Sequence, residues 1–171
     1  MIDIIAQALG LVGLVIIVLS FQCKSNRNFF LMQGTGSFMF FLNFILIGAV
    51  GGALFNLANL VRGLLFSKDG EKPWKLKVVL LLYTVCFLIS LYMDHSLKQI
   101  VLVFLPYSAL MIMSVLMNKG NAITIRKFQI AFMSPAWIIH NIFNFSLGGI
   151  ICETFNMVSS FIFLQRKKLG K

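Results

Sequence analysis

The sequence predicts an all-α polytopic membrane protein with seven transmembrane helices. Three observations carry this prediction: 59 % of the 171 residues are apolar, only 12 % are charged, and the mean hydropathy is +0.92. A soluble domain of this length has roughly a quarter of charged residues, because its surface must face water. Most of this surface therefore meets lipid, and helices satisfy the backbone N–H and C=O groups that lipid cannot.

Apolar runs along the chain approach or reach the roughly 20 residues that cross a bilayer as a helix. We predict helices over residues 4–21, 29–46, 49–66, 78–93, 100–117, 128–145 and 148–164. Asp3 and no Lys or Arg precede the first run, and no small-residue cleavage site with a soluble region follows it. We therefore interpret the first run as a span rather than as a cleaved signal peptide.

The basic residues predict how the spans are oriented. The first, third and fifth loops and the C-terminal tail contain Lys24, Arg27, Lys68, Lys72, Lys75, Lys77, Lys119, Arg126, Lys127, Arg166, Lys167, Lys168 and Lys171. The N-terminus and the alternate loops hold only Lys98. Because Lys and Arg accumulate on the cytoplasmic side, the N-terminus is predicted outside and the C-terminus in the cytoplasm, which requires an odd number of spans. The same rule accounts for the net charge of +10, so we expect no nucleic-acid partner.

Two segments of the chain align when one is shifted by 97 residues along the other. The matched positions are Asn43 with His140, Gly51–Gly52 with Gly148–Gly149, Asn56 with Glu153, and Asn59 with Asn156. The shift carries spans one to three onto spans five to seven and leaves span four as a linker. It predicts a 3+1+3 architecture of parallel repeats, related by an axis along the membrane normal. The chain then divides into a first three-helix bundle (1–66), a cytoplasmic loop plus linker helix (67–99), and a second bundle with a basic tail (100–171).

Glycine, proline and tryptophan suggest local roles. The glycine pairs of the two repeats permit tight reversals between neighbouring helices. Gly10 and Gly13 serve close helix packing or a dimer interface, so a homo-oligomer is left open. Pro106 and Pro135 are predicted to bend spans five and six. Trp74 is expected as an anchor at the membrane surface.

Polar side chains inside the predicted spans mark a candidate binding site. Asn56 and Asn59 in span three lie three positions apart, as do Glu153 and Asn156 in span seven, so each pair shares one helix face. The repeat would let Asn59 and Asn156 face each other across the centre. Each amide offers two donors and an acceptor, which suits a neutral polar ligand resembling a sugar or a nucleoside. The alternative is that these asparagines join neighbouring helices, at about 0.6–2 kcal/mol each.

Glu153 is a carboxylate within a predicted span. An acid there costs on the order of 2.5–3.5 kcal/mol, so we expect it to be paired, protonated or in a water-filled cavity. His140 at the end of span six and Arg62 in span three are the available partners. We favour a cluster of Glu153 with His140 and Asn144 in the outer half of the membrane, which takes up a proton or closes an outer gate. The alternative is a structural clamp on the hairpin of spans six and seven.

Two sequence motifs carry a resemblance to a known family. The pattern HN-x4-S-x-GG-x3-E from His140 to Glu153, and the run FFLN-x3-IGA, closely resemble the bacterial inner-membrane YgjV family across almost the whole chain. This resemblance implies an inner-membrane location and brings no activity with it.

The 3+1+3 plan also resembles the SWEET and PQ-loop sugar transporters and the PnuC-type transporters of vitamin precursors. Their Pro-Gln signature is absent, since Phe21-Gln22 stands in its place. SWEET-like transporters hold substrate hydroxyls with an asparagine pair on the third and seventh helices and close the pocket with a tryptophan from the sixth. By this resemblance Asn59, Asn156 and Trp137 are the candidate substrate contacts.

Two functions from different classes follow from these observations. No Gly-rich phosphate loop, metal-ligand cluster or nucleophile–base set is found, so we expect neither an enzyme nor a cofactor. Cys23, Cys86 and Cys152 lie far apart, without metal or disulfide spacing. We expect an alternating-access transporter or facilitator whose partners are the lipid bilayer and a small polar solute, with both asparagines and Trp137 lining a central cavity. A non-transporting assembly partner or sensor on the same scaffold would instead bond these asparagines to neighbours in a filled core.

Overall fold

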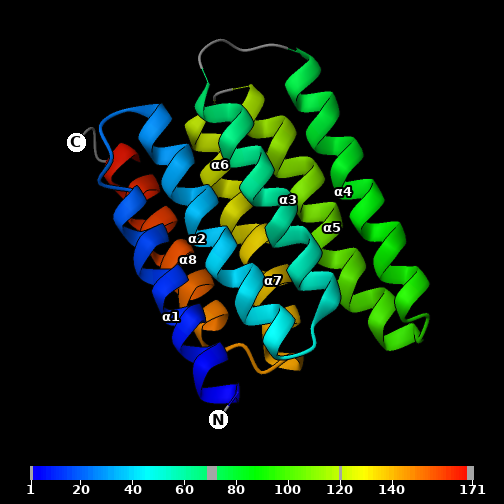
Figure 1. Cartoon of the computed structure of the whole chain (residues 1–171). Helices are drawn as coiled ribbons and strands as arrows, with labels where there is room; N and C mark the ends of the chain where they lie inside the picture. The colour runs from blue at the N-terminus through cyan, green and yellow to red at the C-terminus, as the bar shows by residue number, and fades with distance from the viewer. Residues whose placement is uncertain (1, 69–72, 120, 169–171) are drawn as a thin grey trace.

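The structure of the protein, a computed structural model, describes residues 2–68, 73–119 and 121–168. All regular structure within these ranges is helical (Figure 1). The elements are α1 (Ile2–Ser20), α2 (Asn26–Leu46), α3 (Val50–Ser67), α4 (Pro73–Met93), α5 (Leu97–Asn118), α6 (Ala122–Phe128), the π-helix η1 (Gln129–Met133), α7 (Ser134–Phe143) and α8 (Leu147–Lys168). Six helices, α1 to α5 and α8, are long and apolar enough to cross a membrane. The elements α6, η1 and α7 follow one another without a loop across the sixth predicted span.

Capping residues explain where several helices begin. Ser25, Ser96 and Asn121 precede α2, α5 and α6, and each side-chain oxygen accepts a hydrogen bond from a backbone N–H three residues later. Such a cap satisfies one of the free donors in the first turn of a helix. Pro73 takes the first position of α4, where its missing N–H is not needed. The helices α4 and α6 therefore begin at residues 73 and 122 rather than at the predicted 78 and 128. Pro73 and the Asn121 cap define these starts, and the apolar runs do not.

The sixth helical rod changes its hydrogen-bond pattern directly before Pro135. The N–H of Ser134 donates to the carbonyl of Gln129, five residues earlier, which closes a π-turn. Proline has no N–H to donate, and its ring clashes with the carbonyl four residues before it. A single π-turn inside a helix absorbs such a conflict and is frequent at functional sites. Pro106, by contrast, lies within the uninterrupted α5.

The helices pack in a circuit around the middle of the protein (Figure 1). On one side α1 packs on α2, and α8 packs on both α7 and α1. On the other side α4 packs on both α3 and α5, which have little direct contact with each other. Gly10 and Gly13 serve internal contacts of α1, since an added Cβ would lie 3.6 Å from Cα of Gly148 or 3.0 Å from the backbone oxygen of Gly36.

The reversals α2–α3 and α7–α8 have the same backbone conformation at positions 97 residues apart. The N–H groups of Ile47, Gly48 and Ala49 donate to the carbonyls of Asn43, Ile45 and Phe44, and those of Asn144, Phe145 and Ser146 donate to the carbonyls of His140, Ile142 and Asn141. The middle residues, Gly48 and Phe145, both have a positive φ, of 76° and 54°. The two turns therefore share one geometry although their side chains differ.

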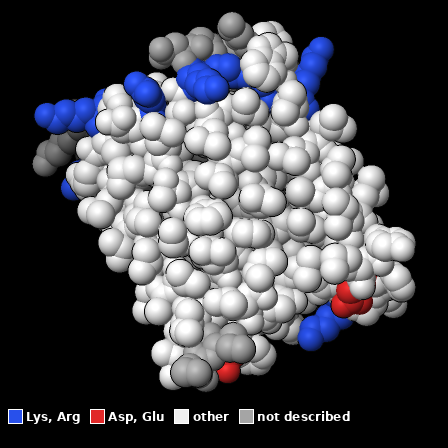
Figure 2. All heavy atoms as spheres, in the orientation of Figure 1, with Lys and Arg blue, Asp and Glu red and all other residues white. Residues whose placement is uncertain are grey.

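On the surface, charged residues gather at the two ends of the bundle (Figure 2). One end, which we call the basic end, contains the α1–α2, α3–α4 and α5–α6 connections and the end of α8 (Figure 1). Its described basic residues are Lys24, Arg27, Lys68, Lys75, Lys77, Lys119, Arg126, Lys127, Arg166, Lys167 and Lys168. Lys72 and Lys171, which the same prediction included, lie outside the described residues. The opposite end carries Asp3, Asp94 and Lys98.

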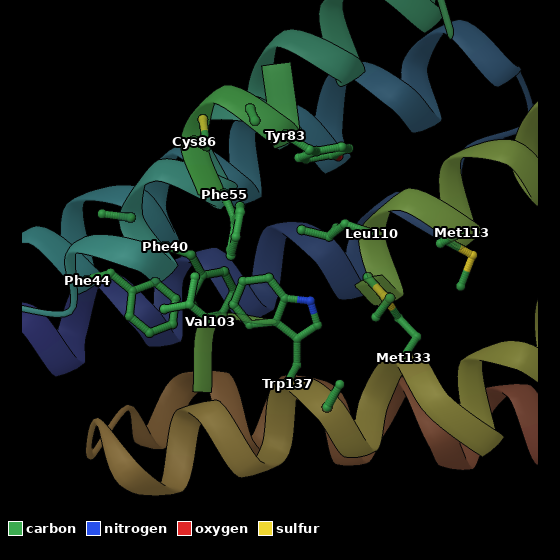
Figure 3. Close-up of a cluster of buried hydrophobic side chains, with 14 of the residues drawn as sticks. Phe40, Phe44, Phe55, Tyr83, Cys86, Val103, Leu110, Met113, Met133 and Trp137 are labelled. Carbon is green, nitrogen blue, oxygen red and sulfur yellow. The ribbon is translucent and has the colours of Figure 1, made fainter. Parts of the chain in front are cut away.

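Between these ends the protein exposes apolar side chains and buries polar ones. Leu81 and Phe161 are 65 % and 57 % exposed, whereas Asn43 and His140 are almost completely buried. Lipid favours this distribution, because it has no groups that can hydrogen-bond to polar side chains. Inside the bundle, Trp137 extends from α7 into the cluster of buried aromatic and aliphatic side chains (Figure 3).

Candidate functional site

A small cavity lies in the middle of the circuit of helices. Its volume is about 100 Å³, and it is lined by residues of α1, α2, α3, α5, η1, α7 and α8. We call it the inner cavity. Its polar lining consists of Gln33, Ser37, Asn56, Asn59, Arg62, Gln129, Asn141, Glu153 and Asn156. Polar groups from both halves of the chain therefore converge on one cavity inside the bundle.

A larger hollow, of about 680 Å³, leads to the inner cavity from the basic end. We call it the vestibule. It shares the lining residues Gln33, Met117, Gln129 and Asn156 with the inner cavity, so the two spaces adjoin. Four cationic side chains line it: Arg27, Lys68, Lys75 and Arg126. No Asp or Glu is found among the described residues that line the vestibule.

The structure brings the three predicted substrate contacts, Asn59, Asn156 and Trp137, to the inner cavity. Asn59 already has a protein partner, since its Oδ1 accepts a hydrogen bond of 2.6 Å from the hydroxyl of Tyr83. The Oδ1 of Asn156 is buried and has no partner among the described residues. These two amides, predicted as a symmetric pair, are therefore not equivalent.

Trp137 forms the wall of the inner cavity together with aromatic neighbours. Its ring centroid lies 6.1 Å from that of Phe44 and 5.4 Å from that of His140. Figure 3 shows the indole between the helices, with Phe40 and Phe44 on one side of it. These contacts hold the ring in place and present an apolar surface to the cavity.

Glu153 binds two side chains of the sixth helical rod. Its Oε2 accepts hydrogen bonds from Ser134 Oγ at 2.6 Å and from Gln129 Nε2 at 3.3 Å. Gln129 Nε2 also donates to Ser134 Oγ at 2.7 Å. Both partners flank the π-turn, so the irregular helix before Pro135 supplies the groups that satisfy the carboxylate. This cluster was not predicted from the sequence, in which the adjacent Ser134 and Pro135 are the one signal that could have suggested it.

The predicted cluster of Glu153 with His140 and Asn144 is wrong. Both ring nitrogens of His140 are buried and lack a hydrogen-bond partner in the described part of the chain. Asn144 Nδ2 instead donates to the backbone oxygen of His140 at 2.7 Å, at the end of α7. The physical reason is the register of the hairpin. It reverses at Phe145, so Glu153, eight residues further on, lies level with a deeper part of the sixth rod than His140 does.

His140 occupies an aromatic environment instead. Its ring lies 5.4 Å from that of Phe44, and its other aromatic neighbour is Trp137. An added Cβ at Gly52 would stand 2.6 Å from His140 Cε1, so the glycine makes room for the imidazole. His140 therefore packs α7 against α3.

The remaining predicted polar residues, Asn43, Asn56 and Arg62, have distinct surroundings. Asn56 Nδ2 donates to the carbonyl of Gly52, one turn earlier in α3, at 2.9 Å. Arg62 is only 8 % exposed and lines the inner cavity, and its Nη1 has no partner among the described residues. Arg62 and Glu153 line the same cavity without forming an ion pair in the described part of the chain.

Asn43 joins α2 to α1 and to the α7–α8 hairpin. Its Oδ1 accepts a hydrogen bond from Ser146 Oγ at 2.8 Å, and its Nδ2 donates to the carbonyl of Ala6 at 2.8 Å. Gln7 extends this network, since its Nε2 donates to the carbonyl of Phe145 at 2.8 Å and its Oε1 accepts from the N–H of Leu147 at 3.0 Å. We call this set of hydrogen bonds the polar latch. It lies at the opposite end from the vestibule (Figure 1).

These features define the class of the protein. Apolar helices that face outward, polar side chains that converge on an interior cavity, and exposed charges gathered at the two ends are typical of a polytopic helical membrane protein. Residues 4–169 match the family model Imp-YgjV, described as bacterial inner membrane protein, and the chain belongs to this family. The protein is therefore located in the bacterial inner membrane. Comparison with curated proteins and with solved structures gave no match.

Proposed function

We propose that the protein is a small alternating-access carrier, not an enzyme, that moves a polar small molecule across the inner membrane. The observation that carries this proposal is the inner cavity, which Asn59, Asn156 and Trp137 line together. The vestibule leads to it from one end, and the polar latch joins α1, α2 and the α7–α8 hairpin at the opposite end of the bundle. A carrier that is open to one side has this arrangement.

The proposal includes seven spans, with α6, η1 and α7 together forming the sixth. The positive-inside rule supports an orientation with the basic end in the cytoplasm. The vestibule would then open inward and the latch would close the outer side. Two further observations support a 3+1+3 parallel repeat. The two hairpins have equivalent hydrogen bonds, and α4 packs outside the cavity lining, as a linker helix would.

Transport would require the polar latch to open while the vestibule closes. The latch contains few hydrogen bonds, and each contributes little net free energy, about 0.5–1.5 kcal/mol. Partners on both sides of the latch, Gln7, Asn43 and Ser146, can exchange these bonds for bonds to water. We propose this latch as the outer gate, in place of the predicted Glu153–His140 pair.

A second candidate is a non-transporting membrane protein, such as an assembly partner or a sensor, on the same scaffold. The bond between Tyr83 and Asn59 favours it, since one of the two asparagines is occupied by a neighbour. In this case the latch would stay closed.

Cysteine labelling distinguishes the two candidates without knowledge of the substrate. The native Cys23, Cys86 and Cys152 are free thiols and would first be replaced by Ser or Ala. Asn156→Cys then places one thiol where the vestibule meets the inner cavity. Reaction with a membrane-impermeant maleimide is followed in right-side-out and in inverted vesicles. A carrier gives labelling from both sides, faster from the basic side.

A disulfide across the latch provides the matched control. Asn43→Cys with Ser146→Cys joins positions whose side-chain oxygens lie 2.8 Å apart. Oxidation should stop labelling of Asn156→Cys from the outer side only, and a reductant should restore it. Lys98→Cys and Lys68→Cys, on the two ends, report which face each vesicle exposes. Labelling from the basic side alone, with or without the disulfide, would refute the carrier.

A further inference from the structure

Arg62 is a buried cation whose Nη1 has no hydrogen-bond partner among the described residues. It lies on α3 with 8 % of its surface exposed, and it lines the inner cavity. Its Nη1 is buried and donates no hydrogen bond to the described residues, and Arg62 forms no ion pair with them. A guanidinium carries five donors and a permanent charge, so this burial is unfavourable unless an acceptor reaches it.

The membrane topology does not account for Arg62. The positive-inside rule places cations in loops and at helix ends, where they meet water and lipid headgroups. Arg62 is instead one turn or more inside α3, which ends at Ser67, and its side chain faces the interior. Charged residues with this placement commonly face a substrate or ion pathway.

Glu153, the carboxylate among the described residues of the same cavity lining, forms no ion pair with Arg62. Both groups line the inner cavity, but the Oε2 of Glu153 is engaged by Ser134 and Gln129 of the sixth rod. The cavity lining thus contains a carboxylate whose Oε2 has hydrogen-bond donors and a guanidinium whose Nη1 has no acceptor among the described residues.

The described residues that line the path to Arg62 carry cationic and no acidic side chains. Arg27, Lys68, Lys75 and Arg126 line the vestibule, and its described lining contains no carboxylate. Like charges along a cleft with apolar walls focus the field and raise the local concentration of the opposite ion. Phe21, Phe29, Phe30 and Phe66 supply such walls here.

We propose that the inner cavity binds a small molecule through an anionic group, a carboxylate or a phosphate, which Arg62 contacts directly. This inference rests on the proposed function and replaces the neutral ligand expected from the asparagines alone. The planar fork of a guanidinium matches carboxylate and phosphate oxygens with two parallel hydrogen bonds. The free Oδ1 of Asn156 accepts a hydrogen bond from a donor group on the same molecule, and Trp137 covers its apolar part.

Tryptophan fluorescence can test anion binding without a transport assay. The chain has two tryptophans, so Trp74→Phe leaves Trp137, in the wall of the cavity, as the single reporter. Quenching of purified protein by iodide, caesium and acrylamide at constant ionic strength compares an anion, a cation and a neutral molecule. We expect iodide to quench at least about threefold more strongly than caesium, because the field concentrates anions. Millimolar acetate and phosphate should relieve the iodide quenching, each according to its own affinity, and glucose should not.

Variants assign this effect to Arg62. Arg62→Gln should weaken the preference for iodide, since the vestibule cations remain, and should abolish its relief by acetate and phosphate, whereas Arg62→Lys should retain both. Arg126→Gln in the vestibule is the matched control, expected to weaken iodide quenching while the relief remains. Unchanged acrylamide quenching in each variant confirms that the cavity is intact.

Two outcomes would overturn the proposal. One is iodide quenching no stronger than caesium quenching in the Trp74→Phe parent, a result that does not depend on any Arg62 variant folding. The other is an Arg62→Gln protein with the same quenching and the same relief as the parent. Either result leaves the labelling test of Asn156→Cys untouched, so failure of the anion site and failure of the carrier are separate findings.

Discussion

The two glycine hairpins, α2–α3 and α7–α8, share a backbone and differ in chemistry. Equivalent hydrogen bonds and a positive φ at Gly48 and Phe145 give them the same turn. Yet Asn56 binds its own helix, whereas its counterpart Glu153 binds across to Ser134 and Gln129. The two hairpins therefore have the same backbone geometry where the helices reverse, but their interior side chains at matched positions have different partners.

The environment of each hairpin also differs at its first matched polar pair. Asn43 makes two hydrogen bonds in the polar latch, while His140 makes none in the described part of the chain and packs on aromatic rings. Of these two matched residues, Asn43 thus belongs to the polar latch, and His140 fills space between aromatic side chains in the core. Five predictions, in order of decreasing effect, test how far the two hairpins are equivalent and compare them with the α4–α5 turn.

The glycines Gly148 and Gly51 should respond unequally to alanine. A Cβ at Gly148 would lie 2.5 Å from the backbone carbon of Gly10, which cannot move without shifting α1. A Cβ at Gly51 would meet Val103 Cγ2 at 2.7 Å, a side chain that can rotate. Gly148→Ala should therefore destabilise by about 3 kcal/mol and Gly51→Ala by about 1 kcal/mol, the two ends of the range for overpacking. Equilibrium unfolding in mixed micelles measures both, and equal losses would contradict the inference.

Removal of the polar groups should separate Glu153 from Asn56. Glu153→Ala leaves Ser134 and Gln129 without their acceptor, so we expect a loss of about 2 kcal/mol. Asn56→Ala removes a bond within one helix, and we expect about 0.6 kcal/mol. The same unfolding assay compares them.

Glu153→Gln tests a proton role for Glu153 during transport. Gln retains an acceptor oxygen for Ser134, so its effect on stability should be smaller than that of Glu153→Ala. If Glu153 exchanges a proton as the protein changes conformation, Glu153→Gln removes the pH dependence of outer-side labelling at Asn156→Cys. An unchanged pH profile would exclude that role.

Substitutions at Gly48 and Phe145, the positive-φ residues of the two turns, should change stability by a smaller amount. A Cβ added at Gly48 would meet no atom within 4 Å, so only the positive φ opposes Gly48→Ala. A left-handed conformation costs an L-residue roughly 1–2 kcal/mol, and we expect a loss near the lower figure. Phe145→Gly should relieve the same strain in the second hairpin and leave stability equal or higher. A loss on Phe145→Gly would show that the exposed phenyl group contributes more than the strain.

The smallest effect on stability is expected at the α4–α5 turn. This turn lies at the same end of the bundle as the two hairpins, contains no glycine and has no counterpart in the repeat. The N–H of Ser96 donates to Asp94 Oδ1 at 2.9 Å, and this bond lowers the pKa of the carboxyl. The stabilisation is therefore complete above the ordinary pKa of about 3.9 and is lost as the pH falls through the lowered value. Asp94→Asn should remove this acid-dependent part, which unfolding midpoints at several pH values would detect.

The spans could be predicted from the sequence because hydropathy and the Lys and Arg distribution act over whole helices. The apolar runs did not predict helix starts that depend on a single residue, such as Asn121 before α6 or Pro73 at the start of α4. The convergence of Asn59, Asn156 and Trp137 followed from a resemblance, and the structure does bring them to one cavity.

Partners of buried polar groups could not be predicted in the same way. The position of Glu153 against Gln129 and Ser134 depends on the π-turn, which changes the facing of side chains by a fraction of a turn. The absence of a described partner for Arg62 likewise emerges only when every neighbouring helix is in place. Sequence separation says which residues share a helix face, but not which helix that face meets.

The circuit of helices is not closed in the same way on its two sides. On one side α1 and α8 meet directly, through Gly10 and Gly148, along a seam that the polar latch continues. On the other side a whole helix, α4, joins α3 to α5. If the protein alternates its access as proposed, this packing places the hinge at α4 and the contact that separates between α1 and α8. Movement would then be widest where the two glycines touch and smallest beside Tyr83, which α4 supplies to the interior.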